Sequence, residues 1–188
     1  MTTATAPPQL LTGDEFLRLY GDQSGFELDN NGQLVRLDMP GPNHGEICVN
    51  AASIIRDFVK PKKLGRVCGN DTYIRTNTSP DRFRGGDVVY VSFETYAADL
   101  PTPKKYFAPP LELVIDVKSP SDSFTSVSEK ATEYLDAGVK VVLFLDPETE
   151  SAGIYRGNEF PQRFHNGDEI TLPDILPSFS VPVKQFFA

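Results

Sequence analysis

The sequence predicts a single α/β domain with a central mixed β-sheet flanked by α-helices. Two nearly unbroken apolar runs, residues 111–118 and 139–145, are typical of central strands buried on both faces. Apolar residues between them recur at helical spacing up to Gly138, and the order strand, helix, strand predicts a parallel pair with a crossover helix. A hydrophobic content of 39% suits one core for residues 1–188, with residues 1–10 expected to be a flexible N-terminus.

The elements before the first central strand follow from caps, turns and periodicity. Residues 12–15, Thr-Gly-Asp-Glu, form a capping box that predicts a short helix. An Asn-Asn-Gly turn at residues 30–32 lies between two apolar triplets and predicts a hairpin. Asn43 with Glu46 resembles a second helix cap. In chain order, the predicted elements are the short helix, hairpin strands at 26–28 and 34–37, a helix over roughly residues 44–60, and strands at 65–68, 72–75 and 87–91.

The elements around and after the central strands are bounded by breakers. Residues 77–86 are polar and turn-rich, so the next strand is expected to begin at Asp87. A Pro-rich loop, residues 100–110, leads into the first central strand. Ser-Pro-Ser-Asp at residues 119–122 is expected to stop that strand and cap the crossover helix. Short meandering strands are expected from Ser151 onward.

Composition narrows the function classes. The formal net charge of −8 argues mildly against a nucleic-acid partner, although a bound divalent cation reverses the sign of a carboxylate cluster locally. No apolar run approaches the roughly 20 residues of a membrane span, so no membrane partner is expected. The first residues do not resemble a secretory signal, and Cys48 and Cys68 are expected to be small buried hydrophobes in a reducing cytoplasm.

Three charged residues on apolar strands are the candidates for chemistry. Asp116 and Lys118 are two apart on the first central strand, so they are expected on one face, and Asp87 begins another strand. Two carboxylates on neighbouring strands repel each other unless a cation lies between them. Oxygen ligands with room for water suit Mg²⁺ or Mn²⁺ better than zinc, and a nearby lysine can orient a water molecule.

The sequence resembles the Uma-two family within the PD-(D/E)XK nuclease superfamily, a bacterial endonuclease family long carried as a domain of unknown function. An aspartate followed by Asp-X-Lys on a later strand is the superfamily pattern, and it is weak alone. The combined order of motifs is more specific and spans roughly residues 10–187. The motifs are Phe26-Glu27-Leu28, His44, Asp87-Val88-Val89, Ser119-Pro120-Ser121-Asp122, Lys130 with Tyr134, Ala137-Gly138-Val139 and Leu145-Asp146-Pro147.

The resemblance implies a restriction-endonuclease-like core and a role for each matching residue. Asp87 and Asp116 look like the metal-binding carboxylates, with the Val117 carbonyl as a further ligand, and Lys118 looks like the catalytic lysine. Glu27 resembles the family's N-terminal glutamate, which either supports the site or binds metal. The other two matching positions, whose roles are less settled, are His44 and Lys130.

The chain departs from the family pattern in a few places. Gly86 stands where the family often has proline, and Asp116 where it often has glutamate. Residues 141–143 are Val-Val-Leu where many members have Glu-Tyr-Trp, which we interpret as a repacked core. Lys118 stands where many members have an apolar residue, so the nuclease pattern is more complete here than usual.

Ordinary structural roles compete with each assignment. Asp116 with Lys118 could be a strand-end ion pair, and Asp87 a strand-start cap. Glu27 could be an exposed hairpin carboxylate. His44 could cap or pack a helix, and an exposed position is the default for Lys130.

Three functions therefore compete. The first is a cytoplasmic Mg²⁺- or Mn²⁺-dependent DNA endonuclease, a homodimer by family analogy. The second is a binding or regulatory protein that kept the fold and lost catalysis, which the acidic composition favours. The third is a metal-dependent enzyme acting on another substrate, because a fold does not determine a function.

Overall fold

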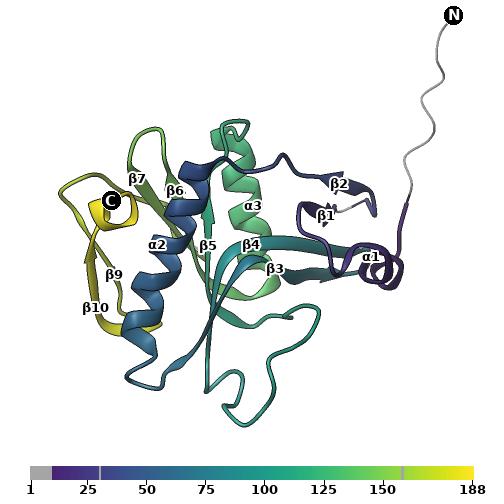
Figure 1. The fold of residues 1–188 in the computed structure, drawn as a ribbon, viewed down its shortest axis with the longest axis horizontal. Helices are drawn as coiled ribbons and strands as arrows, with labels where there is room; N and C mark the ends of the chain where they lie inside the picture. Colours follow the sequence, from purple (N-terminus) through teal and green to yellow (C-terminus); the bar gives the residue numbers. More distant parts are fainter. Residues whose placement is uncertain (1–9, 30, 158) are drawn as a thin grey trace, which may run out of the picture.

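A computed structural model describes residues 10–29, 31–157 and 159–188. An eight-stranded mixed sheet forms its centre, in the order β2-β1-β4-β5-β6-β7-β8, with β3 also paired to β4 (Figure 1). The predicted α/β class with a central mixed sheet is confirmed. The strands are β1 (Phe26–Leu28), β2 (Leu34–Arg36), β3 (Gly65–Thr78), β4 (Asp81–Ser92), β5 (Leu111–Val117), β6 (Val139–Asp146), β7 (Ser151–Arg156), β8 (Gln162–Phe164), β9 (Glu169–Leu172) and β10 (Leu176–Pro182). The helices are α1 (Gly13–Tyr20), α2 (Pro42–Val59), α3 (Phe124–Ala137) and the 3₁₀ turn η1 (Val183–Phe186).

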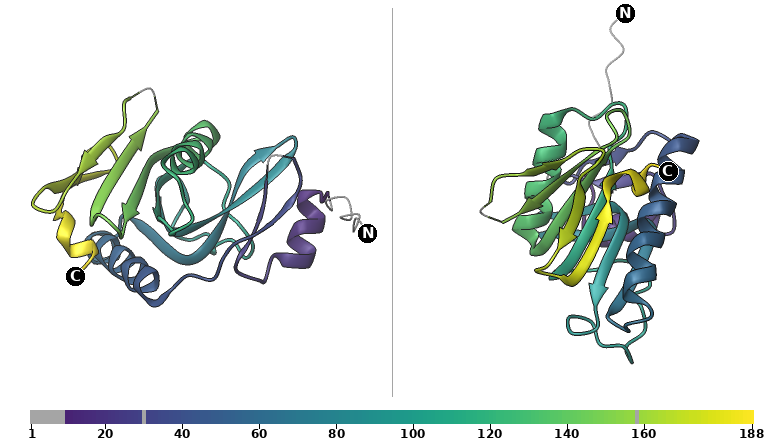
Figure 2. Two further views of the ribbon diagram at one scale, coloured as in Figure 1. Left: turned by 90° about the horizontal axis from the view of Figure 1, so that it is seen from above. Right: turned by 90° about the vertical axis from the view of Figure 1, so that its left-hand side faces the viewer.

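Two helices cover opposite faces of the sheet (Figure 2). Every residue of β5 is buried: Leu113, Ile115 and Val117 pack in the cluster under α2, and Val114 packs in the cluster under α3. β5 and β6 run parallel with α3 as their crossover, which confirms the predicted unit. None of the helices in the described part of the chain has the length and apolar character needed to cross a membrane.

Strand β4 positions the functional part of the sheet. Along one edge it pairs with β3 over nearly its whole length. Along the other edge it pairs first with β1, at Phe83 opposite Leu28, and then with β5 through residues 88–90. Residues 84–87 of β4 therefore lie between the end of the β1 pairing and the start of the β5 pairing.

The N-terminal elements agree with their sequence signals. Thr12 caps α1 and accepts a hydrogen bond from the Glu15 backbone, while the Glu15 carboxylate accepts one from the Thr12 backbone, which confirms the capping box. The hairpin of β1 and β2 is also confirmed. Asn30 of its predicted turn lies outside the described residues, as do Asn158 and the expected flexible N-terminus up to residue 9.

Strands 65–68 and 72–75 were predicted as separate, but they are one strand, β3. A bulge between Gly69 and Thr72 leaves Asn70 and Asp71 with φ of 64° and 52° without ending the ladder. The polar segment 77–86 was predicted as a turn, but most of it belongs to β3 and β4. Asp87 consequently lies well inside β4 rather than at its start.

Both predicted caps of the later helices were wrong by a few residues. Helix α2 begins after Gly41, with Pro42 at its first position and no side-chain cap, because proline's fixed φ already suits a first helical turn. Helix α3 is capped by Ser123, which exchanges hydrogen bonds with Ser126. Gly138 ends α3 in the left-handed conformation, as predicted from its position.

Two glycine substitutions test whether Gly138 is required for its left-handed conformation at the end of α3, with Gly45 inside α2 as the comparison. Gly138 has φ of +107°, where an L side chain is strained, so Gly138→Ala is expected to lower the free energy of unfolding by about 1–2 kcal/mol. Gly45 lies in exposed helix with no atom within 4 Å of an added Cβ, so Gly45→Ala is expected to raise it by roughly 0.5–1 kcal/mol. Urea unfolding followed by circular dichroism measures both variants. Changes of the same sign in the free energy of unfolding would contradict the conformational requirement at Gly138.

Candidate active site

A cavity of about 810 Å³ opens beside residues 84–87 of β4. It receives side chains from β1, β3, β4 and β5 and from helices α2 and α3. Its charged and titratable lining residues include Glu27, His44, Asp71, Arg84, Asp87, Asp116 and Lys130. All the sequence-predicted site residues except Lys118 are among the described residues that line this cavity.

Asp87 and Asp116 meet because of the antiparallel register of β4 and β5. Val88 pairs with Ile115, so the next position places Asp87 opposite Asp116. The backbone N–H of Asp87 donates to Asp116 Oδ1 at 3.2 Å, and the backbone N–H of Val117 donates to Asp87 Oδ2 at 2.7 Å. Each carboxylate is thus held by the strand that carries the other.

The carboxylate pair carries an electrostatic cost. Asp116 is 2% exposed. Burial, and then the negative charge of Asp116, raise the pKa of Asp87 to about 6. Asp116 Oδ2 is buried and receives no hydrogen bond from the described residues, although Lys130 Nζ lies 2.8 Å away as an ion contact without hydrogen-bond geometry. Asp116 Oδ2 is therefore held by the charge of Lys130 rather than by a directed hydrogen bond.

Lys130 reaches this pair from α3, one turn before Tyr134. Its ammonium lies 2.8 Å from Asp116 Oδ2, 3.7 Å from Glu27 Oε1 and 3.4 Å from the Gly85 carbonyl oxygen. Burial acts to lower the pKa of Lys130, but the electrostatic interactions with Asp116, Tyr134 and Glu27 together outweigh it, so the net pKa is well above the ordinary value. The lysine expected to be exposed by default is a half-buried cation at the centre of the site.

Glu27 is also buried, at 2% exposure, so it is not an exposed hairpin carboxylate. The pairing of β1 with β4 places it beside Arg84, whose Nη1 donates to Glu27 Oε2 at 2.7 Å. The Gly85 backbone N–H donates to its other oxygen at 3.0 Å. Arg84 also donates to both carboxylate oxygens of Glu133 on α3, so these contacts tie β1, β4 and α3 together.

Lys118 lies elsewhere, and the expectation that it shares a site with Asp116 is not met by its contacts. Its Nζ is 3.2 Å from Asp146 Oδ2 and 3.7 Å from Glu148 Oε2, beyond the end of β6. Lys118 follows the last residue of β5, and its N–H still donates to the Leu145 carbonyl of the parallel strand β6. Its long side chain is held by the carboxylates at the end of β6 and just after it, instead of reaching the carboxylate pair.

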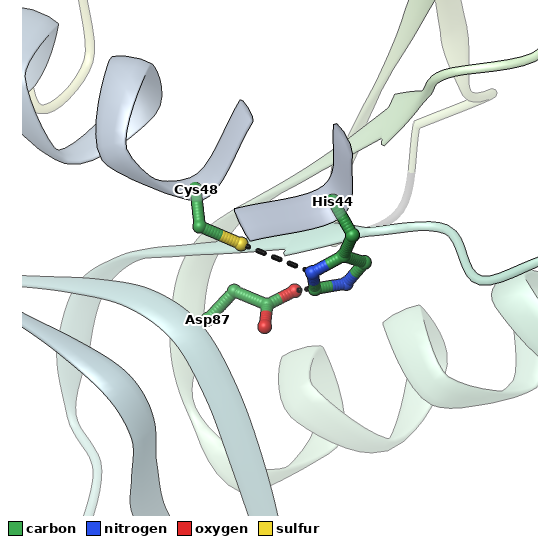
Figure 3. A group of neighbouring side chains, drawn as sticks. All are labelled: His44, Cys48 and Asp87. Carbon is green, nitrogen blue, oxygen red and sulfur yellow. Dashed lines mark hydrogen bonds and ion pairs between the residues drawn. The ribbon is translucent and has the colours of Figure 1, made fainter. Parts of the chain in front are cut away.

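His44 lies on the first turn of α2, over the edge of the carboxylate pair. Its Nε2 is 3.1 Å from the Val117 carbonyl oxygen and 3.6 Å from Asp87 Oδ2. The Val117 carbonyl, predicted as a metal ligand, therefore faces the cavity and already has one polar neighbour. Cys48, one turn further along α2, places its Sγ 3.4 Å from His44 Nδ1 (Figure 3).

Asp71 is a cavity residue that the sequence interpretation missed. It lies on the β3 bulge, in a segment that was predicted to be the break between two separate strands. Burial raises the pKa of Asp71, Lys130 lowers it, and the charges of Asp116 and Glu27 raise it further. The available signal was the Asn-Asp pair itself, because these residues tolerate the left-handed conformation that a bulge requires.

The donor set fits a hard divalent cation. Asp87 and Asp116 offer carboxylate oxygens from adjacent strands, and Val117 offers a carbonyl oxygen at the same edge. The raised pKa of Asp87, caused by burial and by the Asp116 charge, indicates that this carboxylate has too little positive charge beside it. Mg²⁺ and Mn²⁺ prefer such oxygen ligands.

A mixed sheet with paired carboxylates on adjacent central strands and a half-buried lysine above them defines a restriction-endonuclease-like protein. The chain belongs to the Uma2 family, described as "Putative restriction endonuclease", whose sequence model matches residues 14–184. The fold is similar to that of a "putative nuclease" from Anabaena variabilis, with a TM-score of 0.81 and 20% identity over 94% of this chain and 97% of that chain. No curated protein matches the chain.

Paired lysine variants test which ammonium supports the buried carboxylates. Lys130→Met leaves Asp116 and Glu27 without their shared cation, so it is expected to lower the free energy of unfolding by about 3–5 kcal/mol. Lys118→Met removes contacts to Asp146 and Glu148, which are 27% and 84% exposed, so its effect is expected within ~1 kcal/mol. Urea denaturation at neutral pH compares them, and equal losses would refute the role of Lys130 as the cation of the two buried carboxylates.

Proposed function

We propose that this protein is a metal-dependent endonuclease that hydrolyses phosphodiester bonds in DNA. Asp87 and Asp116 would hold Mg²⁺ or Mn²⁺, with the Val117 carbonyl as a further ligand. Glu27 would act indirectly, by holding Arg84 and Lys130 in place rather than by touching the substrate. Membership of a family of restriction-endonuclease-like nucleases supports hydrolysis of nucleic acid, and DNA is the substrate we assign.

The placement of Asp87 opposite Asp116 on adjacent strands is the observation that carries the proposal. Two largely buried carboxylates repel each other, and a cation bound between them would relieve that repulsion. When bound, the cation supplies positive charge against the charge that develops on the phosphate. The cation also accounts for DNA recognition by an acidic protein, because it makes the cavity locally attractive to phosphate.

Two lysines compete for the role of orienting the attacking water. The Asp-X-Lys pattern assigns Lys118, whose ammonium would have to leave Asp146 and Glu148 to reach the carboxylate pair. Lys130 is already 2.8 Å from Asp116 Oδ2 and lines the cavity. We therefore assign water positioning and charge stabilisation to Lys130, with Lys118 as the alternative.

A second candidate function is a binding or regulatory protein that has lost catalysis. The net charge of −8 favours it, and so does the engagement of two of the cavity cations, Arg84 and Lys130, by protein carboxylates. We also infer a cytoplasmic homodimer. Two free, half-buried cysteines suit a reducing compartment, and cutting both strands of a duplex suits two subunits.

Asp116→Asn tests the metal-dependent chemistry. Wild-type protein is expected to cleave plasmid or oligonucleotide DNA with Mg²⁺ or Mn²⁺ and to stop when EDTA is added. Asp116→Asn is expected to lower the rate by at least about 10³-fold, because it removes one charged ligand while preserving the side-chain shape.

The matched control is Asp136→Asn, at an exposed position of α3, which is expected to cleave at the wild-type rate. Cleavage that persists in EDTA, or in Asp116→Asn, would contradict the mechanism. Failure of wild-type protein to cut any of several DNA and RNA substrates would favour the binding function.

A comparison of Lys130→Met with Lys118→Met identifies the catalytic lysine. Lys130→Met is expected to lower the cleavage rate by roughly 10²–10³-fold, the usual effect of losing one group that stabilises developing charge, while Lys118→Met changes it less than about tenfold. Rates are measured at a temperature where circular dichroism shows both variants folded. The opposite order would assign the role to Lys118.

A further inference from the structure

Beside the carboxylate pair lies a second cluster of possible metal ligands. His44 and Cys48 are four residues apart on α2, so they lie on one face of the helix, directly above Asp87 of β4 (Figure 3). One donor atom from each residue lies within 4.8 Å of the other two. The cluster thus brings together one nitrogen, one sulfur and one oxygen ligand.

The separations suit a tetrahedral ion. Bonds of ~2.0–2.3 Å to zinc place tetrahedral ligand atoms about 3.3–3.8 Å apart. Cys48 Sγ and His44 Nδ1 are 3.4 Å apart, so one edge of such a tetrahedron already exists. Small side-chain movements of Asp87 would complete the remaining edges.

The orientation of His44 leaves Nδ1, the ring nitrogen that faces Cys48, free to bind a metal ion. Its Nε2 faces the Val117 carbonyl oxygen at 3.1 Å, and because a carbonyl only accepts, this bond requires a proton on Nε2. In the neutral ring, Nδ1 then carries a lone pair directed at Cys48. A metal-binding histidine commonly donates its other N–H to a carbonyl in this way, which fixes the ring orientation.

The side chains of His44 and Asp87 are 17% and 14% exposed and line the cavity, so an ion can reach them from solvent. Without a cation, burial and the charge of Asp87 raise the pKa of the Cys48 thiol, which keeps it protonated near neutral pH. A bound cation displaces that proton to solvent and forms bonds to sulfur, nitrogen and oxygen without any change of oxidation state.

We propose that His44, Cys48 and Asp87 form a second metal site, which selects zinc-like ions over magnesium. Sulfur and imidazole ligands suit Zn²⁺ and Co²⁺, whereas Mg²⁺ takes oxygen ligands. The two sites share Asp87, so an ion at the second site competes with the cation held by Asp87 and Asp116. Zinc binding itself does not depend on the proposed nuclease function, whereas inhibition of cleavage by zinc does.

Cobalt absorption tests the site without any activity assay. Titration of reduced full-length protein with Co²⁺ is expected to give a cobalt–thiolate charge-transfer band that saturates at one ion per chain and is abolished by Zn²⁺. Cys48→Ser is expected to lose the band and to bind Zn²⁺ at least about tenfold more weakly. The matched control is Cys68→Ser, which removes the other free, half-buried thiol and is expected to keep both properties.

Two results would overturn the site: no thiolate band in wild-type protein, or an equal band in Cys48→Ser. Circular dichroism confirms that the variants are folded, and Cys48→Ala provides a second thiol deletion if Cys48→Ser is unstable. In either variant the loss of the band must accompany a native spectrum.

Zinc inhibition tests the sharing of Asp87. In the Mg²⁺-dependent cleavage assay, Cys48→Ser is expected to keep the basal rate and to require at least about tenfold more Zn²⁺ for half-inhibition than wild type. Equal zinc sensitivity of wild type, Cys48→Ser and Cys68→Ser would overturn the competition. If no form of the protein cleaves DNA, the proposed function fails, and the cobalt band still decides whether the second site exists.

Discussion

The structure depends on pairing two carboxylates that are buried inside the sheet. Glu27 and Asp116 are each 2% exposed. Buried charges are tolerated only when they are paired. Here Lys130 on α3 contacts both carboxylates, and Arg84 on β4 joins Glu27 to Glu133 of α3. These ion contacts tie α3 to the sheet in addition to its apolar packing, so a helix that covers the core also contributes to the site.

The interrupted pairing of strand β4 places these buried charges beside a cavity. Its one edge is shared between β1 and β5, so residues 84–87 lie at the gap where neither neighbour pairs fully. Backbone groups that would otherwise bond in the ladder meet side chains instead: the Gly85 N–H donates to Glu27, and the Asp87 N–H donates to Asp116. The site is a local interruption of the sheet, completed by carboxylates.

Asp87 would belong to both proposed metal sites at this interruption of the sheet. On one side it faces Asp116, an oxygen donor suited to hard ions, and on the other it faces His44 and Cys48, whose nitrogen and sulfur suit softer ones. A single carboxylate cannot serve both at full strength, because each ion needs its negative charge. The identity of the available metal would thus decide which neighbours Asp87 engages.

The sequence by itself determined the α/β class, the parallel β5–β6 pair with its crossover helix, and the candidacy of Asp87 and Asp116, because apolar runs and breakers are local signals. Only the tertiary structure decided which lysine accompanies them. Lys118 is next to Asp116 in the pattern but turns to Asp146 once β5 ends, while Lys130 arrives from a helix. The position of Asp71 in the cavity and the contact of Cys48 with His44 were equally beyond the pattern. Strand register, bulges and helix placement bring distant residues together, and no local spacing encodes those contacts.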